Sequence, residues 1–247
     1  MKRHDSRLQN QLRKIKITPH VLDYAEGSVM VEFGNTRVLC AASYEPKAPS
    51  WLMGTGAGWV TAEYGMLPRS THTRIKREKS QSGGRTQEIS RLVGRSLRSC
   101  VDLKLLGEKQ ITIDCDVINA DGGTRTAAVT GGFVALAFAL KKLNDLSEIK
   151  TIPLKHYVAA VSVGLAEENA TITPILDLNY EEDSDISTDM NFVMTDKNDF
   201  IEIQGTAEDG TFSRQQLLGM MALAEQGCQQ LFIEQEKLIG NFFPLKR

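Results

Sequence analysis

Residues 114–132 read Asp-Cys-Asp-Val-Ile-Asn-Ala-Asp-Gly-Gly-Thr-Arg-Thr-Ala-Ala-Val-Thr-Gly-Gly and contain a change of periodicity. Around the start of this stretch, apolar residues alternate with polar ones, which predicts a strand: Ile111, Ile113, Cys115 and Val117. Towards its end and beyond, apolar residues recur at helical spacing: Ala128, Val129, Phe133, Leu136, Ala137 and Leu140. Residues 121–124 therefore predict a tight turn that leads from the strand into the helix.

The predicted turn has the composition of an anion-binding site. Gly122 and Gly123 lack side chains, so a ligand can approach the backbone closely. The N–H groups of a first helical turn favour an anion, and the guanidinium of Arg125 can bind two of its oxygens. Taken alone, a Gly-Gly pair before a helix also fits a plain tight connection.

A dense acidic run follows later in the chain, with carboxylates at Asp177, Glu181, Glu182, Asp183, Asp185 and Asp189. Such a run is usually a solvated loop, but apolar residues at 172–178 and 190–194 flank it and predict buried strands. Carboxylates at the ends of buried strands point into a core or a cleft, where like charges need a cation or an arginine partner. Hard oxygen ligands suit Mg2+ or Mn2+. An anion site together with a metal site indicates phosphoryl chemistry.

A series of ordered motifs resembles the bacterial ribonuclease PH family. The matching segments are residues 25–34, 58–74, 84–89, 121–126, 182–184, 189–191 and 204–206. The chain departs from the family pattern at Ser6, where an N-terminal Arg-Xaa-Asp-Gly-Arg sequence often has glycine. The tail at 242–247 matches no expected motif.

The resemblance implies an α/β (α+β) fold with two similar lobes of mixed β-sheet packed with helices. Residues 1–247 would form a single ribonuclease PH domain. The first lobe, about residues 15–145, would carry the phosphate site, and the second, about residues 153–240, the carboxylate cluster. Only the short connection from Leu146 to Pro153 separates them. The resemblance also implies a homohexameric ring, a trimer of dimers.

The resemblance assigns roles to particular residues. The phosphate-binding residues would be Arg85, Gly123, Thr124 and Arg125. The catalytic, metal-bearing pair would be Asp183 and Asp189, with Asp177 as a weaker third catalytic candidate, whereas Asp185 fits a turn residue. Charge clustering, rather than the resemblance itself, makes a basic loop with Arg69, Arg74 and Arg77 the RNA-binding candidate, although a solvated loop has the same composition.

Composition places these motifs in an ordinary globular chain. Its 247 residues are 41% apolar, enough for one substantial core or two fused halves. No apolar run approaches the roughly 20 residues needed to span a bilayer, and the N-terminus lacks a secretory signal, so we expect a cytoplasmic protein without a membrane partner. The scattered cysteines predict reduced core residues: Cys40, Cys100, Cys115 and Cys228.

Net charge argues against a protein that coats nucleic acid, because it is only −2. Basic residues nevertheless cluster at the N-terminus and in one loop, where they could neutralise a few phosphates: Lys2, Arg3, Arg7, Arg13, Lys14 and Lys16, and then Arg69, Arg74, Lys76, Arg77 and Lys79.

Periodicity predicts the remaining elements. We expect a hairpin over 28–42, a helix over 86–105, strands over 156–165 and 171–178, a hairpin turn at 196–199, and a helix that runs from the N-cap Ser213 towards 238.

The chemistry indicated is attack of inorganic phosphate, the co-substrate, on the last phosphodiester of an RNA 3′ end. This reaction would release nucleoside 5′-diphosphates. The resemblance implies that it trims transfer RNA precursors and other RNA, and that it is reversible. No nucleophile–base pattern surrounds the histidines His4, His20, His72 and His156. A catalytically silent RNA-binding ring subunit is the alternative, and retention of both arginines and the acidic pair argues against it. A scaffold protein, a third possibility, would show no phosphate dependence.

Overall fold

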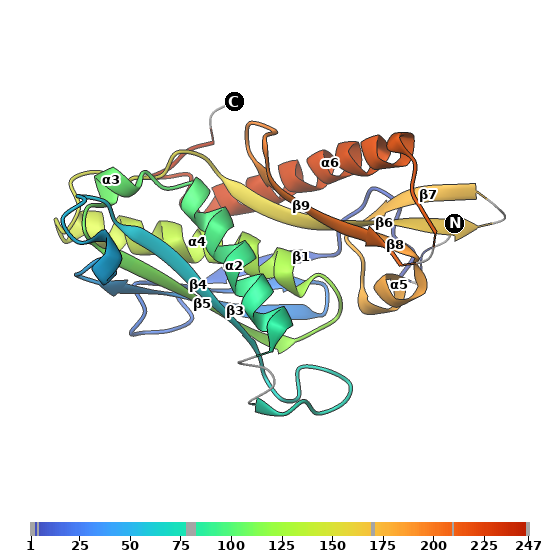
Figure 1. Ribbon diagram of the computed structural model, residues 1–247, viewed down its shortest axis with the longest axis horizontal. Helices are drawn as coiled ribbons and strands as arrows, with labels where there is room; N and C mark the ends of the chain where they lie inside the picture. Colours follow the sequence, from blue (N-terminus) through green and yellow to red (C-terminus); the bar gives the residue numbers. More distant parts are fainter. Residues whose placement is uncertain (1–2, 4, 78–82, 169–170, 209, 246–247) are drawn as a thin grey trace.

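The computed structural model describes residues 3, 5–77, 83–168, 171–208 and 210–245, which form two β-sheets with helices packed on them (Figure 1). The strands are β1 (Ile15–Pro19), β2 (Gly27–Phe33), β3 (Thr36–Glu45), β4 (Trp59–Met66), β5 (Gln110–Asn119), β6 (Val158–Glu168), β7 (Thr171–Leu176), β8 (Thr188–Thr195) and β9 (Phe200–Ala207). The first sheet has the order β1-β2-β3-β5-β4 and the second β7-β6-β8-β9. All neighbouring strands are antiparallel except β4, which runs parallel to β5.

One long helix joins the two sheets. The helical elements are η1 (Ser50–Leu52), α2 (Gly84–Ser99), α3 (Leu103–Leu106), α4 (Thr124–Asp145), α5 (Tyr180–Asp185) and α6 (Arg214–Ile239). Helix α4 packs on β2 and β3 of the first sheet and on β6 of the second, α2 covers β4, and α6 covers β6 and β7 (Figure 1). One cluster of buried apolar residues therefore runs through both lobes, with α4 at its centre.

Helix α4 reaches the sheet closely because small residues face the strands. A Cβ atom added to Gly131 would lie 2.5 Å from Cγ1 of Val31, so only glycine fits there. By length and composition α4 could cross a membrane, but 83% of its apolar window is buried inside the protein, as expected of a core helix. This window does not stand out in the sequence as a continuous apolar run, because threonines and glycines interrupt its apolar residues.

Most elements predicted from periodicity are confirmed, and two differ. The helix expected over 86–105 ends at Ser99, because Val101 pairs with Leu154 and Asp102 caps the separate helix α3 through the N–H groups of Lys104 and Leu105. The strand predicted over 171–178 is β7, which ends two residues earlier, at Leu176. All four cysteines are buried and free, and burial raises the pKa of the Cys100 thiol to about 12, which keeps it unreactive.

The acidic run is a capped helix rather than a loop. The Asn179 side chain accepts a hydrogen bond from the Glu182 N–H, and the Glu182 carboxylate accepts one from the Asn179 N–H. This reciprocal pair is a capping box, which starts α5 and places carboxylates in its first turn, where the helix dipole favours them. Six residues are too few for a helical period to be visible in the sequence.

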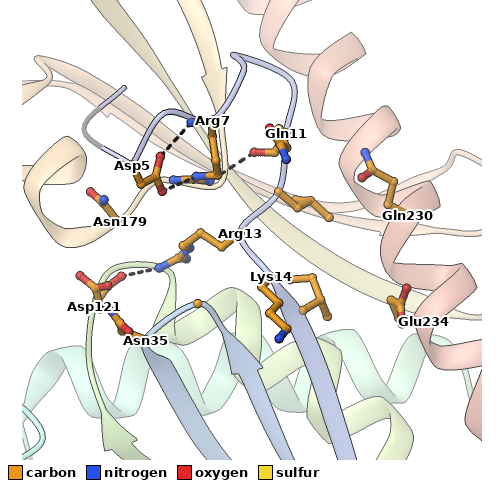
Figure 2. Close-up of a pocket in the computed structure, with 13 residues that line it drawn as sticks. Asp5, Arg7, Gln11, Arg13, Lys14, Asn35, Asp121, Asn179, Gln230 and Glu234 are labelled. Atoms are coloured by element: carbon orange, nitrogen blue, oxygen red, sulfur yellow. Dashed lines mark hydrogen bonds and ion pairs between the residues drawn. The ribbon is translucent and has the colours of Figure 1, made fainter. Parts of the chain in front are cut away.

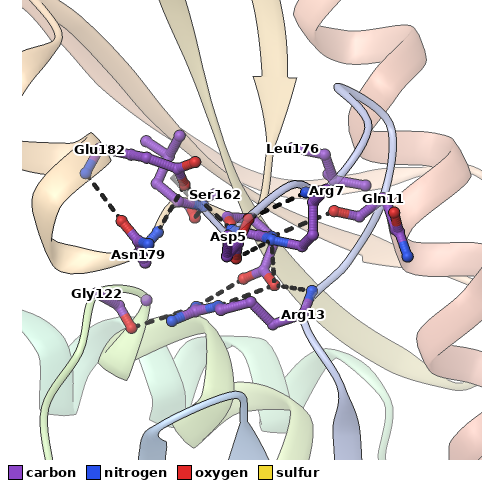
Figure 3. A network of polar contacts seen from close by, with 12 residues as sticks. Asp5, Arg7, Gln11, Arg13, Gly122, Ser162, Leu176, Asn179 and Glu182 are labelled. Carbon is purple, nitrogen blue, oxygen red and sulfur yellow. Dashed lines mark hydrogen bonds and ion pairs between the residues drawn. The ribbon is translucent and has the colours of Figure 1, made fainter. Parts of the chain in front are cut away.

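In the N-terminal arm, residues 3 and 5–14, the three arginine side chains are buried in ion pairs and do not form an RNA-binding patch, whereas most other residues of the arm are exposed (Figure 3). Arg3 is only 1% exposed and forms a bidentate pair with Glu182 at 2.6 Å from both Nε and one terminal nitrogen. Arg7 and Arg13 are also buried, so these three side chains cannot neutralise RNA phosphates as the charge pattern suggested. Lys14 and Lys16 remain on the surface, and Lys2 lies outside the described residues.

The arm contains a strained residue at the position where the family pattern often has glycine. Ser6 has φ 64°, a left-handed conformation that costs a residue with a Cβ roughly 1–2 kcal/mol. Its N–H donates to the Arg3 carbonyl at 2.9 Å, so the turn that buries Arg3 depends on this conformation.

We expect Ser6→Gly to increase the free energy of unfolding by about 1 kcal/mol, because glycine adopts this φ without steric cost. Denaturant unfolding measures the change, with Ser6→Ala as the control that removes the hydroxyl and keeps the Cβ. An equal gain in both variants, or none in Ser6→Gly, contradicts the assignment of strain.

Candidate active site

A cleft of about 1040 Å³ lies between the two lobes and is lined by residues of both. The first lobe contributes the turn between β5 and α4 and the start of α2, and the second contributes α5, β8 and β9. The predicted phosphate residues and the predicted metal pair therefore face one cavity, although they lie in different halves of the sequence: Arg85, Gly123, Thr124 and Arg125, and then Asp183 and Asp189.

The turn before α4 requires glycine at two consecutive positions. Gly122 and Gly123 have φ 73° and 65°, and Gly123 is the N-cap of α4. A Cβ on Gly122 would lie 2.6 Å from the Leu178 carbonyl oxygen, so the turn packs directly on the backbone that precedes α5. The next residue, Thr124, shares a 2.8 Å hydroxyl contact with Tyr64, which fixes the first turn of the helix. The N–H groups of that turn lack partners within the helix and suit an anion.

Two arginines supply positive charge to the cleft. One terminal nitrogen of Arg125 donates to the Gln204 side chain at 3.0 Å and lies 3.5 Å from the Glu88 carboxylate, so β9 and α2 orient it. Arg85, at the start of α2, is exposed to solvent and lines the same cleft. The positive charges of both guanidinium groups favour the ionised form of the nearby Asp183 carboxylate.

The two carboxylates come from different elements of the second lobe. Asp183 belongs to α5, and Asp189 lies on β8 between Gly164 of β6 and Thr206 of β9. Desolvation in the cleft and the negative charge of Asp189 raise the pKa of Asp183, against the opposing effect of Arg85 and Arg125. Among the described residues, no three His, Cys, Asp or Glu side chains form a metal cluster. Two carboxylates suffice for Mg2+, which usually keeps several waters and shares its coordination with substrate phosphates.

Asp177, the third catalytic candidate, does not line the cleft with the other candidates. It is fully buried, and both of its carboxylate oxygens accept hydrogen bonds from Arg13: one from the backbone N–H and Nε, the other from a terminal nitrogen. Burial alone would raise its pKa, but the Arg13 charge holds that pKa below its usual value. This carboxylate is buried, paired with Arg13 and absent from the cleft lining, so a ligand in the cleft does not reach it.

The basic loop borders the mouth of the cleft. Thr71, His72, Thr73 and Ile75 line the cavity, and the Arg69 side chain donates to the His72 carbonyl at 3.0 Å. Arg74 and Arg77 are exposed on the same loop, whereas Lys79 lies outside the described residues.

The structure adds residues that the sequence reading did not single out. The Gln204 side chain orients Arg125, and the rings of His72 and Tyr180 meet at 5.3 Å at the edge of the cleft. Gln204 lies in the quoted motif at 204–206, so the motif contained the signal, but its partner is 79 residues away. The ring pair has no sequence signal, because it joins the basic loop to α5.

Comparison with known proteins defines the class. The profile of the 3′ exoribonuclease family, domain 1, matches residues 11–141, and that of domain 2 matches residues 156–227. The fold agrees: a chain of the Archaeoglobus fulgidus exosome with RNA bound to its active site superposes with a TM-score of 0.78, at 20% identity over 94% of this chain and 92% of that one. Rice (Oryza sativa) Rrp46 gives 0.73, at 22% identity over 97% and 99%.

A nearer relative narrows the class. The chain is 69% identical over 243 residues to ribonuclease PH of Bdellovibrio bacteriovorus, covering 98% of each protein. It therefore belongs to the 3′ exoribonuclease family, on the ribonuclease PH branch. The predictions of this family, of its mixed α/β fold and of a phosphate-dependent exoribonuclease are confirmed.

We expect Asp183→Asn to raise the thermal midpoint in metal-free buffer near neutral pH. A raised folded-state pKa means that folding disfavours the ionised form, so this penalty is present above the folded pKa and disappears as pH falls below the ordinary value of 3.8. Asp185→Asn, at the last residue of the same helix and outside the cleft lining, is the matched control. A midpoint that rises equally in both variants, or a gain for Asp183→Asn that persists at pH 3, would contradict the raised pKa of Asp183 in the cleft.

Proposed function

We propose that the cleft is the site at which this phosphorolytic 3′ exoribonuclease carries out its reaction. The observation that carries the proposal is that an anion site from one lobe and a carboxylate pair from the other line the same cavity. Inorganic phosphate would bind at Gly123 and Thr124, with Arg85 and Arg125 on its oxygens. Each charge-assisted hydrogen bond contributes about 1.5–3 kcal/mol, enough in combination to hold phosphate at millimolar concentration.

In the proposed reaction, a phosphate oxygen attacks the phosphorus atom of the last phosphodiester bond. A new P–O bond forms as the bond to the 3′ oxygen of the preceding nucleotide breaks, and that oxygen takes a proton to become the new 3′ hydroxyl. The terminal nucleotide leaves as a nucleoside 5′-diphosphate. Such a transfer needs in-line positioning and stabilisation of spread negative charge, which the two arginines and the first turn of α4 provide. Because a diphosphate forms, the reverse reaction can lengthen RNA.

The carboxylate pair fits a divalent cation. Asp183 and Asp189 would hold Mg2+, or Mn2+, whose charge would neutralise the phosphate oxygens and relieve the repulsion between the two side chains. The raised pKa of Asp183 supports this role, because a carboxylate disfavoured as an anion gains most from a bound cation.

Transfer RNA precursors are the proposed physiological substrates. Arg69, Arg74 and Arg77 would contact the phosphates of the RNA body while the 3′ end enters the cleft, because their loop forms part of its mouth. A silent RNA-binding subunit is the weaker alternative, since it would not need an arginine pair and a carboxylate pair in one cavity.

A homohexameric ring in the cytoplasm is also proposed. Large apolar side chains are exposed on this single chain, among them Trp51 at 62% and Met53 at 64%, and contiguous apolar surface favours subunit contacts. Two similar structures are chains of the Archaeoglobus fulgidus exosome and of an archaeal exosome core. Four free buried cysteines fit a reducing compartment.

We expect Arg125→Ala to reduce phosphorolysis by roughly a hundred- to a thousandfold while RNA binding stays largely intact, because its partner is the attacking phosphate. High phosphate should restore the rate only in part. The measurement is the release of nucleoside diphosphates across a phosphate series, beside RNA affinity. Lys150→Ala, an exposed lysine away from the cleft, is the control. Near-normal turnover of Arg125→Ala at low phosphate would move the phosphate site elsewhere.

A further inference from the structure

We propose that Arg13 is a positioning residue for the phosphate-binding turn, and that the N-terminal arm fixes the position of this turn relative to helix α5, which carries Asp183. The inference rests on the proposed function of the turn at residues 121–124. Arg13 lies on the side of this turn away from the cleft: it lines a separate polar cavity of about 580 Å³, and it is not among the residues of the cleft itself (Figure 2). Any influence of Arg13 on phosphate must therefore pass through the turn.

The Arg13 guanidinium joins three parts of the chain. It binds both oxygens of Asp177 in the second lobe, at 3.0 Å from Nε and 2.7 Å from a terminal nitrogen. Its terminal nitrogens also donate to the carbonyl oxygens of Asp121 and Gly122, the latter at 3.4 Å (Figures 2 and 3). One side chain thus holds the phosphate-binding turn of the first lobe to the end of β7 in the second.

The Arg13 guanidinium also packs directly against the turn. A Cβ on Gly123 would lie 2.9 Å from a terminal nitrogen of Arg13, so the guanidinium packs directly beneath the N-cap of α4. From the first lobe, the Thr36 hydroxyl donates to the Gly122 carbonyl at 2.6 Å and accepts from the Asp121 N–H at 3.0 Å. Arg13 and Thr36 together fix the backbone of Asp121 and Gly122, and the residues that follow, Gly123 and Thr124, line the cleft.

The same arm fixes the helix that carries Asp183. Arg3 and Arg7 donate to the carboxylate of Glu182, the residue before Asp183, and Glu182 closes the capping box of α5. The Tyr180 N–H at the start of this helix donates to the Asp121 carboxylate of the turn at 3.3 Å. Arginines of the N-terminal arm therefore contact both the turn and helix α5, although no residue of the arm lines the cleft.

Positioning, rather than stability alone, is the role that this chemistry suits. Replacing a buried ion pair by uncharged residues is often neutral for stability, so the pair by itself does not account for a guanidinium here. Arginine presents a planar fork of five donors, whereas lysine presents a compact charge that cannot span a carboxylate and two carbonyl groups. A shift of about 1 Å in a reactant's position can cost a hundredfold in rate.

The experiment compares Arg13→Lys, the double variant Arg13→Met/Asp177→Asn, and the control Lys141→Gln, which breaks an exposed ion pair on α4. Asparagine suits position 177 because φ there is 55°, and it leaves no buried charge unpaired. For each variant, KM for phosphate and kcat are measured on a short unstructured RNA, together with the thermal midpoint. Arg125→Ala is assayed alongside.

We expect KM for phosphate to rise tenfold or more in Arg13→Lys and in the double variant, with the control unchanged. The double variant should keep a thermal midpoint close to that of the unsubstituted enzyme, although its KM for phosphate is raised. If KM for phosphate stays normal in both folded variants, or rises only in a variant whose thermal midpoint falls, Arg13 has only a structural role and the inference is overturned. If the unsubstituted enzyme shows no phosphate dependence, the proposed function falls as well, whereas normal Arg13 variants beside an inactive Arg125→Ala overturn this inference alone.

Discussion

The buried pairing of Arg13 with Asp177 is the contact on which the arrangement of the cleft depends. It brings a charged side chain from the N-terminal arm, a carboxylate from the second lobe and two carbonyl groups of the glycine turn to one point. Both partners are almost completely removed from water, so the pair persists only because nearly every donor and acceptor is satisfied. The mutual pKa effects agree: despite burial, the pKa of Asp177 is lowered and that of Arg13 is raised. The ionised pair is therefore the stable form.

The packing of the apolar core also positions the residues around this contact. Helix α4 packs on strands of both sheets, so its N-terminus is held at the boundary between the lobes, where the turn and α5 meet. Burying each large apolar side chain contributes roughly 1.5–3 kcal/mol, and α4 buries most of its length. A rigid helix start is what an anion site needs, because donors that are already oriented require no reorganisation when charge develops.

Local patterns made much of this predictable. The strand, turn and helix around residues 110–145 were visible because the apolar period changes there and two glycines mark the turn. The placement of Asp183 and Asp189 in one cleft with Arg125 followed from the family motifs. The pairing of Asp177 could not be predicted, since nothing in the acidic run shows that Arg13, 164 residues earlier, neutralises it. The same limit applies to Arg3 and Arg7. A basic N-terminus predicts surface charge, and only the folded structure shows that Glu182 is a buried partner of both side chains. Long-range ionic pairing leaves no periodic trace.

The central claim is that phosphate bound at the glycine turn is the nucleophile. The most direct measurement supplies 18O-labelled inorganic phosphate and Mg2+ with a 3′-extended transfer RNA and determines the label in the products by mass spectrometry. The account predicts nucleoside diphosphates whose terminal phosphate carries the label of the added phosphate. Nucleoside monophosphates with oxygen from water, or diphosphates without label, would contradict it.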